Sequence, residues 1–379
     1  MGDIYRNCVV CLAATNSTNL HSGCYSGNPI RVERFESSSF DLFGGNTTPW
    51  EIYVRNSIPH RALTDPVTPQ PDLEYSPGHL RTRGWVFQER MLAPRYLHFL
   101  EQELAWECRM GVRCECHCQC DVVRMGSTKS EFANSLASNN PSALAFEWRQ
   151  MMVIYCNLNL TKESDRLPAI AGIAKLFQEA RGSTCHAGIW SDSVEEDLAW
   201  QVWQPGPWRY TILKEHTYAR TEGVPTWSWA SVSAPIMYDP LPVDKNERLC
   251  DFFEIGHPGV IPDLKSHKLV VNGYMVPATL VYEGKGEFCN LKVPGYDKPI
   301  QFGNDVSLGV SGPSCIPCDE VLFCLALVKC HLVESRYQYK SLVLQKLDAE
   351  ANVYRRAGIL RHSDNIFNDI SEKSVINIV

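Results

Sequence analysis

The hydrophobic pattern of the chain changes near residue 236, and this change constrains the fold more than any other feature. Before it, apolar residues between positions 141 and 202 recur at the three- and four-residue spacing of helices. After it, short apolar runs alternate with polar turns, as in paired strands. The sequence therefore predicts an α+β protein with two domains, residues 1–235 and a β-rich, antiparallel part over 236–379.

Three helices are expected in the middle of the chain. Proline and serine open the first, proline opens and glycine closes the second, and a Ser-x-x-Glu capping box opens the third. Their expected extents are Pro141 to Tyr155, Pro168 to Gly182, and Ser193 through Leu198 to Val202.

A short helix and a hairpin are expected nearer the N-terminus. Residues 83–92 have helical spacing, and Pro94 prevents its continuation. The strand-like runs 96–100 and 104–108 are separated by a hairpin-length connection. Residues 9–15 are expected as a buried strand, and the proline-punctuated segment 47–59 as an irregular loop.

The C-terminal region is expected to contain several antiparallel strands. Either a sandwich or a partial barrel fits this pattern. The expected strands are 268–276, 278–282, 321–329, 340–347 and 353–360.

The charge and the targeting signals of the sequence limit which partners and which cellular location are expected. The formal net charge is -7 and the isoelectric point is near 5.9, without a dense basic run, so nucleic acid is not an expected partner. No basic segment followed by an apolar core opens the chain, and the longest strongly apolar run, 321–328, is far shorter than a membrane helix. A cytoplasmic protein with no membrane span is expected.

Several phrases resemble the successive signatures of the heterokaryon-incompatibility (HET) family of fungi. They occur in the family's order and span most of the chain. The phrases are MGDIYRN at 1–7, SGCYSG at 22–27, RGWVFQERMLAPRYLHF at 83–99, LAWEC at 104–108, DRLPAIAGIA at 165–174, HAGIWSD at 186–192, PTWSWASV at 225–232 and YRRAGIL at 354–360.

The resemblance implies that residues 1–235 form a partial HET-like α/β core with a helical middle region. In the family, signatures resembling SYxWG and WIDxxCIxQ precede the MGDIY-like phrase, and neither is present here. We therefore expect a chain that begins part-way through the domain. Such a shortened chain is expected to serve other chemistry, and it is similar in kind to the HET-like Diels–Alderases of fungal terpenoid biosynthesis.

A polar cluster is expected around the helix over 83–92. In one interpretation, an Arg or Gln donates a hydrogen bond to a substrate carbonyl and Glu89 orients this donor. In the other, an Arg–Glu network ties the helix to the hairpin. The candidate residues are Arg83, Gln88, Glu89 and Arg95, beside Trp85 and Trp106.

Tryptophans are concentrated between positions 190 and 229. This density is typical of a wall for a large apolar ligand, or of a packed core. Trp227 and Trp229 alternate around Ser228, so on a strand they would share one face and, with Trp190, line a cavity. His186 is a further candidate donor to the ligand.

The cysteines are expected to be ordinary reduced thiols. Sixteen of 379 residues, about 4%, fall below the roughly 8–10% of a disulfide scaffold. The alternating row Cys114–Cys120 and the CxxC pairs at Cys8 and Cys315 leave a zinc site open as a weaker alternative. Catalysis by Cys108, or by Cys185 with His186, is also less favoured, because sequence neighbours on a strand point apart.

Two functions remain after the motifs are considered. No GxGxxG, Walker A, HExxH or GxSxG motif is present, so no cofactor and no metal are expected. The first hypothesis is a cofactor-free cyclase that performs a Diels–Alder-type cycloaddition on an apolar terpenoid or polyketide, with the tryptophans as walls and Arg83, Gln88, Arg95 or His186 as donor. The alternative is an incompatibility or cell-death factor that binds a protein partner through an exposed apolar patch.

Overall fold

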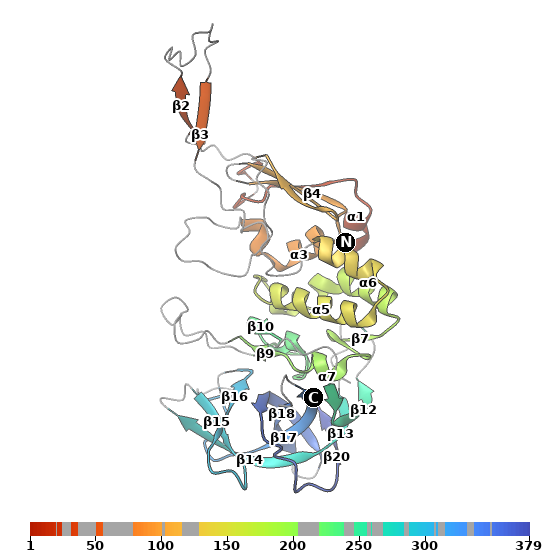
Figure 1. The fold of residues 1–379 in the computed structure, drawn as a ribbon, viewed down its shortest axis with the longest axis vertical. Helices are drawn as coiled ribbons and strands as arrows, with labels where there is room; N and C mark the ends of the chain where they lie inside the picture. The colour runs from red at the N-terminus through yellow and green to blue at the C-terminus, as the bar shows by residue number, and fades with distance from the viewer. Residues whose placement is uncertain are drawn as a thin grey trace, which may run out of the picture.

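The structure is a computed structural model in which the chain forms three layers along its long axis (Figure 1). A small sheet lies at one end, helices lie in the middle, and a β-barrel lies at the other end. The residues described are 1–19, 21–24, 32–36, 51–55, 79–100, 103–115, 129–203, 220–238, 246–255, 259, 268–283, 288–306, 308–309, 315–331, 337–348 and 351–379.

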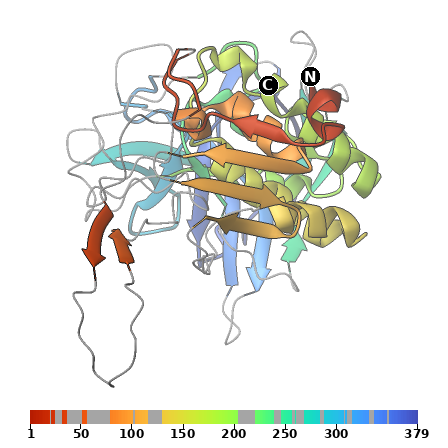
Figure 2. The same ribbon diagram turned by 90° about the horizontal axis from the view of Figure 1, so that it is seen from above.

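The first layer is a four-stranded sheet with the order β1-β4-β5-β6. β1 pairs with β4 in parallel, and the other pairs are antiparallel. Figure 2 shows these strands side by side over the helices. The expected short helix and hairpin are confirmed, as α3 and the pair β4–β5. The elements are α1 (Gly2–Arg6), β1 (Cys11–Ala13), η1 (His79–Thr82), α3 (Gly84–Leu92), β4 (Arg95–Phe99), β5 (Leu104–Cys108) and β6 (Gly111–Cys114).

A separate hairpin, β2 (Val32–Glu36) with β3 (Glu51–Arg55), projects beyond this sheet (Figure 1). The expected loop over 47–59 is therefore wrong for Glu51–Arg55. The alternation Glu-Ile-Tyr-Val-Arg contains three residues that favour strands, and this local preference outweighs the neighbouring prolines.

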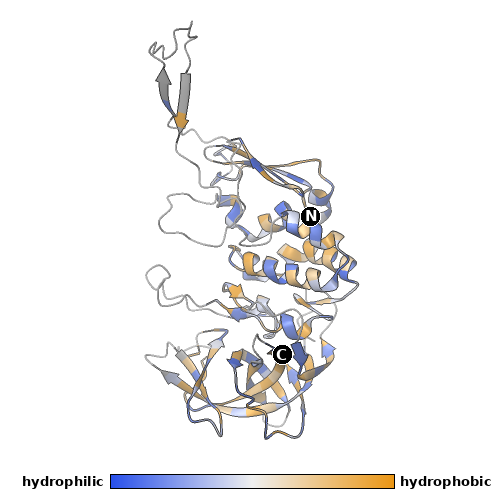
Figure 3. Ribbon diagram, in the orientation of Figure 1, coloured by the Kyte–Doolittle hydropathy of each residue, from blue (hydrophilic) through white to orange (hydrophobic). Residues whose placement is uncertain are grey.

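The middle layer confirms two of the three expected helices. The Oδ1 atom of Asn140 accepts hydrogen bonds from the first backbone N–H groups of α5, at 3.0 and 3.3 Å. Gly182 ends α6 in the left-handed conformation, with φ of 63°. Apolar residues gather along these helices (Figure 3). The elements are α4 (Lys129–Ala137), α5 (Pro141–Tyr155), η2 (Glu163–Asp165), η3 (Pro168–Ile170) and α6 (Ala171–Arg181).

The third expected helix is much shorter than predicted. It is α7 (Val194–Asp197), and Val202 lies instead in β9 (Gln201–Val202). The expected capping box does not form, because the Ser193 hydroxyl donates to Oδ2 of Asp197, at 2.9 Å, rather than capping the helix. The Asp197 carboxylate also accepts from the backbone N–H of Trp190. These bonds hold the chain in a turn.

Short β-pairs connect the helices to the barrel. One core cluster of buried apolar side chains runs from α3 through this region into the barrel, and β9 pairs with β10 on the far side of residue 236. The division into two domains at residue 236 stays a prediction. The connecting elements are β7 (Cys185–His186), β8 (Ile189–Trp190), β9, η5 (Trp229–Ser231) and β10 (Ile236–Met237).

The C-terminal part is β-rich and mainly antiparallel, as predicted, and it contains a closed barrel. The strands β14, β15, β16, β19, β18 and β17 each pair with the next, and β17 pairs again with β14. This ring decides between the sandwich and the partial barrel, since closure leaves no free edge among its strands. β20, β13 and β12 continue from β19 as a side sheet, and β11 pairs with β17.

The strand prediction located the long strands and missed the short ones. β13 and β14 divide at Tyr274, whereas the sequence predicts a break at Pro277. Missed altogether are β11, β12, β15, β16 and β20. The elements are β11 (Asn246–Arg248), β12 (Cys250–Ile255), β13 (Leu269–Gly273), β14 (Met275–Glu283), β15 (Phe288–Lys292), β16 (Ile300–Asn304), β17 (Val321–His331), β18 (Tyr337–Asp348), β19 (Val353–His362) and β20 (Ser374–Ile378).

A buried arginine joins the barrel to the middle layer. Arg356 of β19 has no exposed surface, and its guanidinium donates to both carboxylate oxygens of Asp305, at 2.9 and 3.2 Å. It also donates to the backbone carbonyls of Leu198 and Trp200, at 2.7 and 2.6 Å. Its Cζ atom lies 3.5 Å from the centre of the Trp200 ring.

No helix among the described residues is long and apolar enough to cross a membrane.

We predict that Arg356→Met destabilises the protein by about 3–5 kcal/mol, because the buried Asp305 carboxylate loses both short hydrogen bonds and keeps only the longer contact with Arg220, at 3.4 Å. The matched control is Lys373→Met, which breaks an exposed ion pair with Asp251 and should cost no more than about 1 kcal/mol. Urea unfolding followed by tryptophan fluorescence measures both. Equal losses of unfolding free energy in the two variants would contradict a clamping role for Arg356.

Candidate functional site

The predicted polar cluster around α3 does not form one network of side chains. Arg83 and Arg95 are exposed, and Nη1 of Arg95 donates to the backbone carbonyl of Val9, at 3.3 Å. Gln88 is buried, and its Oε1 accepts the backbone N–H of Gly172 at 2.6 Å. The amide oxygen of Gln88 therefore joins α3 to α6.

The remaining members of this cluster also have structural partners. The indole N–H of Trp85 donates to Asp165, at 3.1 Å, and Trp106 is half-buried on β5. Burial raises the pKa of Glu89, and a hydrogen bond from Tyr5 acts in the opposite direction. This carboxylate thus lies against α1.

The predicted tryptophan wall lies inside the core. Trp190, Trp227 and Trp229 have no exposed surface. The ring of Trp190 meets that of Trp148 edge to face, with centroids 5.3 Å apart. The ring of Trp229 meets Tyr155 in the same way, at 6.1 Å. Because their rings pack against other buried rings, Trp190 and Trp229 are core residues.

The expectation that Trp227 and Trp229 share a strand face is wrong. Trp229 begins the 3-10 helix η5, and the Ser228 hydroxyl caps it by accepting the backbone N–H of Ala230, at 3.1 Å. The same hydroxyl donates to the carbonyl of Ala187, at 2.6 Å. A capping serine between two tryptophans turns the chain, which the alternation of residue types does not indicate.

Gly188 is the meeting point of two of these indoles. Its carbonyl accepts the indole N–H groups of Trp148 and Trp229, at 3.1 and 3.2 Å. Its φ is 90°, and a Cβ atom placed there would lie 2.7 Å from the Trp229 ring. Only glycine allows this approach without displacing the indole.

His186 and Cys185 do not form a catalytic pair. Both are buried on the two-residue strand β7, where successive side chains point to opposite faces. Burial raises the pKa of the Cys185 thiol to about 12, so the nucleophilic thiolate is not populated at neutral pH. His186 also forms an isolated β-bridge with Gly259.

The cysteine row lies mostly outside the described residues. Of its four members, only Cys114 is described, and it is buried on β6. Within the described segments no group of three or more His, Cys, Asp or Glu side chains is arranged to hold a metal ion. Cys315 and Cys318 are exposed free thiols.

A buried relay of polar groups, not identified from the sequence, lies under the N-terminal sheet. Nδ1 of His98 lies 3.1 Å from the Thr15 hydroxyl, and Nε2 lies 3.1 Å from a carboxylate oxygen of Glu107. Arg90 donates two bonds of 2.7 Å to the same carboxylate. Burial lowers the pKa of His98 to about 4, so the neutral imidazole donates from Nε2 and accepts the threonine hydroxyl at Nδ1.

This relay has the order hydroxyl, imidazole, carboxylate, but no substrate can reach it. Thr15 has no exposed surface, and His98 and Glu107 are each 2% exposed. The Arg90 guanidinium and His98 hold the pKa of Glu107 well below its usual range against the effect of burial. The relay therefore connects the segment that follows β1 with β4, β5 and α3 as a buried polar network.

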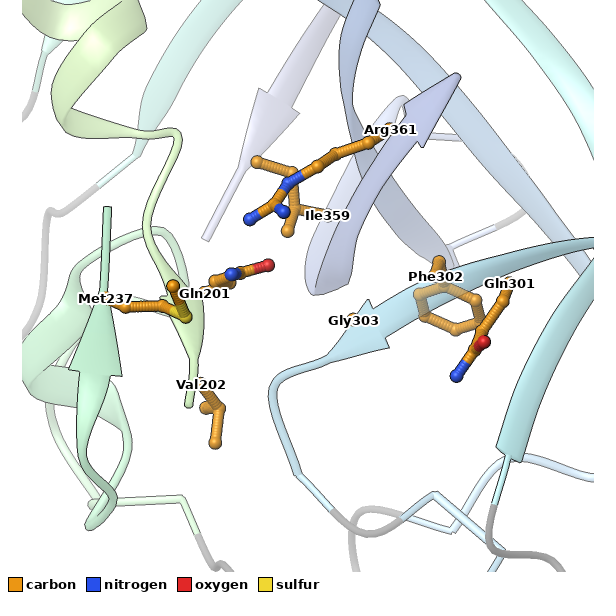
Figure 4. Close-up of a pocket in the computed structure, with 8 residues that line it drawn as sticks. All are labelled: Gln201, Val202, Met237, Gln301, Phe302, Gly303, Ile359 and Arg361. Carbon is orange, nitrogen blue, oxygen red and sulfur yellow. The ribbon is translucent and has the colours of Figure 1, made fainter. Parts of the chain in front are cut away.

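A pocket of about 280 Å³ lies between the pair β9–β10 and the barrel strands β16 and β19 (Figure 4). Ile359 and Gly303 lie directly opposite each other in the barrel wall, and a Cβ atom on Gly303 would lie 3.6 Å from Oε1 of Gln201. The lining residues are Gln201, Val202, Met237, Gln301, Phe302, Gly303, Ile359 and Arg361.

The pocket lining offers apolar surface and hydrogen-bond donors, and its described residues offer no group for covalent or proton-transfer chemistry. Val202, Met237, Phe302 and Ile359 provide apolar surface. Two primary amides and one guanidinium provide hydrogen-bond donors. The lining residues in the described part of the chain include no carboxylate, imidazole or thiol. Of the predicted site residues, none lines this pocket.

Sequence signals for the pocket were weak. Gln201 and Met237 lie on two-residue strands, which no periodicity marks. Arg361 directly follows the phrase YRRAGIL, which indicates the strand but does not include this residue.

Comparisons with family models, curated proteins and solved structures find no match for the chain.

We predict that His98 makes stability fall in mildly acidic solution. Unfolded His98 takes up a proton near pH 6.5 and folded His98 only near pH 4, so the unfolding free energy decreases as the pH falls between these values. From pH 7 to 4.5 this contribution is about 2.5 kcal/mol. Urea unfolding at both pH values should show that His98→Gln loses this part of the pH dependence.

The control for this prediction is His21→Gln, which changes an exposed histidine and should keep the wild-type pH profile. An unchanged pH dependence in His98→Gln would show that the buried imidazole does not resist protonation in the folded state.

Proposed function

We propose that the protein is a cofactor-free cyclase that holds an apolar terpenoid or polyketide in the pocket between β9–β10 and β16–β19. The observation that carries this proposal is the composition of the pocket. Its lining combines apolar walls with hydrogen-bond donors and contains, among the described residues, no side chain for nucleophilic or acid–base catalysis. A pericyclic reaction needs none of these groups.

An intramolecular Diels–Alder cycloaddition needs only apolar walls and a hydrogen-bond donor, which this pocket offers. Two new C–C σ bonds and one new C=C bond replace three π bonds, and no proton, electron pair or leaving group is exchanged with the protein. The pocket walls would hold diene and dienophile within reacting distance. An N–H donor from Gln201 or Arg361, aimed at a carbonyl on the dienophile, would lower the barrier further because that oxygen gains negative charge in the transition state.

The sequence phrases support the same class. The resemblance to HET-domain proteins, and in kind to HET-like Diels–Alderases of fungal terpenoid biosynthesis, agrees with a reaction that uses no cofactor. A cytoplasmic enzyme acting on a small apolar molecule is part of the proposal. In this proposal the hydrogen-bond donor to the substrate is a residue of the pocket. It is not Arg83, Gln88, Arg95 or His186, because these four residues do not line the pocket.

The second candidate is an incompatibility factor that acts through protein contact. Ile4 of α1 is 73% exposed, Val9 is 77% exposed, and Leu12 of β1 is 63% exposed. Among the described strands, β1 pairs on one side only, as the end strand of its sheet. Exposed apolar residues beside such a strand favour binding of another chain.

Deletion of the gene in its host tests the proposed cyclase. We predict that one small-molecule product disappears from the extract and that an isomer of identical mass accumulates, as measured by mass spectrometry. Reintroducing the wild-type gene should restore the product. Gly303→Leu should not, because its side chain would fill the pocket from β16 without strain in the strand.

The matched variant is Ser374→Leu, which adds the same side chain at an exposed position of β20 and should restore the product. An extract that is unchanged by the deletion would exclude the cyclase. If fusion compatibility between strains changed at the same time, the incompatibility factor would be supported instead.

A further inference from the structure

One polar side chain of the pocket, that of Gln201, lies between its two walls. Gln201 of β9 is directly opposite Met237 of β10, so the two side chains share one face of this strand pair. Figure 4 shows the amide of Gln201 reaching from β9 toward Ile359 of β19. A Cβ atom on Gly303 would lie 3.6 Å from Oε1 of Gln201, so the amide lies beside a strand position that has no side chain.

The amide of Gln201 has hydrogen-bonding capacity that the described part of the protein does not use. A glutamine amide offers one carbonyl oxygen and two N–H groups. The buried amide of Gln88 binds the backbone N–H of Gly172, whereas none of the described residues hydrogen-bonds the amide of Gln201. Gln201 is half-buried, and its neighbours Met237 and Ile359 are apolar. A ligand in the pocket would therefore meet an amide that still needs partners.

The other polar side chains of the described lining are in a different situation. Gln301 is exposed, so water can satisfy its amide. Arg361 already has an interaction within the protein, and its Nε and Nη2 atoms are buried. The hydrogen-bond donor to the substrate therefore narrows to Gln201.

An apolar ligand that covered Gln201 would remove water from this amide without replacing the lost hydrogen bonds, which weakens binding. A ligand with only a carbonyl group would pair with an N–H of Gln201 and leave Oε1 unpaired. A ligand amide offers a carbonyl oxygen and an N–H group side by side, so two hydrogen bonds can form edge to edge. The pairing is the same if the amide oxygen and nitrogen of Gln201 exchange places.

We infer that the ligand of this pocket is a compact apolar molecule carrying an amide, and that Gln201 selects it by donating to the ligand carbonyl and accepting the ligand N–H. The volume of about 280 Å³ is near the lower end for ligand pockets, which suits a compact ring system. Lactams and primary carboxamides present both groups on one edge.

This inference rests on the proposed function, because it takes the same pocket as the substrate site. It also names the substrate class more closely, as an unsaturated amide. When the amide carbonyl is conjugated to the dienophile alkene, the hydrogen bond from Gln201 is the one that lowers the barrier of the cycloaddition.

Two probes of nearly identical shape test the inference. The first is 1-adamantanecarboxamide and the second is 1-adamantyl methyl ketone, which has the same cage and carbonyl but a CH₃ group in place of the NH₂ group. Isothermal titration calorimetry at pH 7.5 would measure both affinities for the full-length protein. We expect the carboxamide to bind at least about 5-fold more tightly, because the ketone leaves the amide oxygen of Gln201 unpaired.

The variant Gln201→Met keeps the length of the side chain and removes its hydrogen-bonding groups. It should bring the two affinities to within about 2-fold. The matched control is Gln178→Met, the same substitution at an exposed position of α6, which should keep the wild-type preference.

Further measurements separate loss of the amide from loss of structure. Circular dichroism during thermal unfolding should show that Gln201→Met is folded, and its retained affinity for the ketone should confirm an intact pocket. Gly303→Leu should abolish binding of both probes. Ser374→Leu should bind both as the wild type does.

The outcomes distinguish the two proposals. Equal affinities for the two probes in the wild type, with both lost in Gly303→Leu, would overturn the amide inference and leave the pocket as the ligand site. A preference for the carboxamide that survives Gln201→Met would overturn the role of Gln201. Binding of neither probe, or binding that Gly303→Leu does not affect, would count against both the pocket and the amide. An extract unchanged by gene deletion, together with a preference that depends on Gln201, would contradict the cyclase and support the amide site.

Discussion

The structure depends on the buried guanidinium of Arg356. Its four hydrogen bonds hold together the end of β16, the middle of β19 and the chain that enters β9. The pocket walls begin beside these anchor points: Gln201 follows the anchored Trp200 carbonyl, and Gly303 lies two residues before Asp305. Because an unpaired buried guanidinium is very costly, the three segments keep one arrangement, and the pocket is a consequence of that arrangement.

The phrases that carry the family resemblance are explained mainly by packing. Gln88 binds the backbone of Gly172, which joins the phrase at 83–99 to the phrase at 165–174. Ser228 binds the carbonyl of Ala187, which joins PTWSWASV to HAGIWSD. Arg356 of YRRAGIL extends this network into the barrel. These phrases therefore contact one another within the core of this chain. The pocket lies at the margin of that core, and residues outside the phrases contribute most of its lining.

Local signals predicted the local elements well. Pro141 predicted the start of α5 and Gly182 the end of α6, because each acts on the backbone within a few residues, whereas the Asn140 cap was not predicted. The pocket could not be predicted in this way. Gln201, Gly303 and Arg361 meet only because β9, β16 and β19 are brought together by pairings between distant segments. Tryptophan density did not indicate this pocket, since aromatic rings occur in cores and in pockets alike.

Methyl NMR of protein labelled with ¹³C-methyl methionine tests the central claim, that the ligand lies at the barrel pocket and not among the tryptophans. The chain has eight methionines; Met237 lines the pocket, while Met151 and Met152 lie fully buried on α5 beside the aromatic core. The isomer that accumulates in the deletion strain would be added, with Met237→Leu and Met151→Leu identifying the signals. We predict that the Met237 signal shifts and the α5 signals do not. Shifts of Met151 and Met152 with an unmoved Met237 would contradict the account.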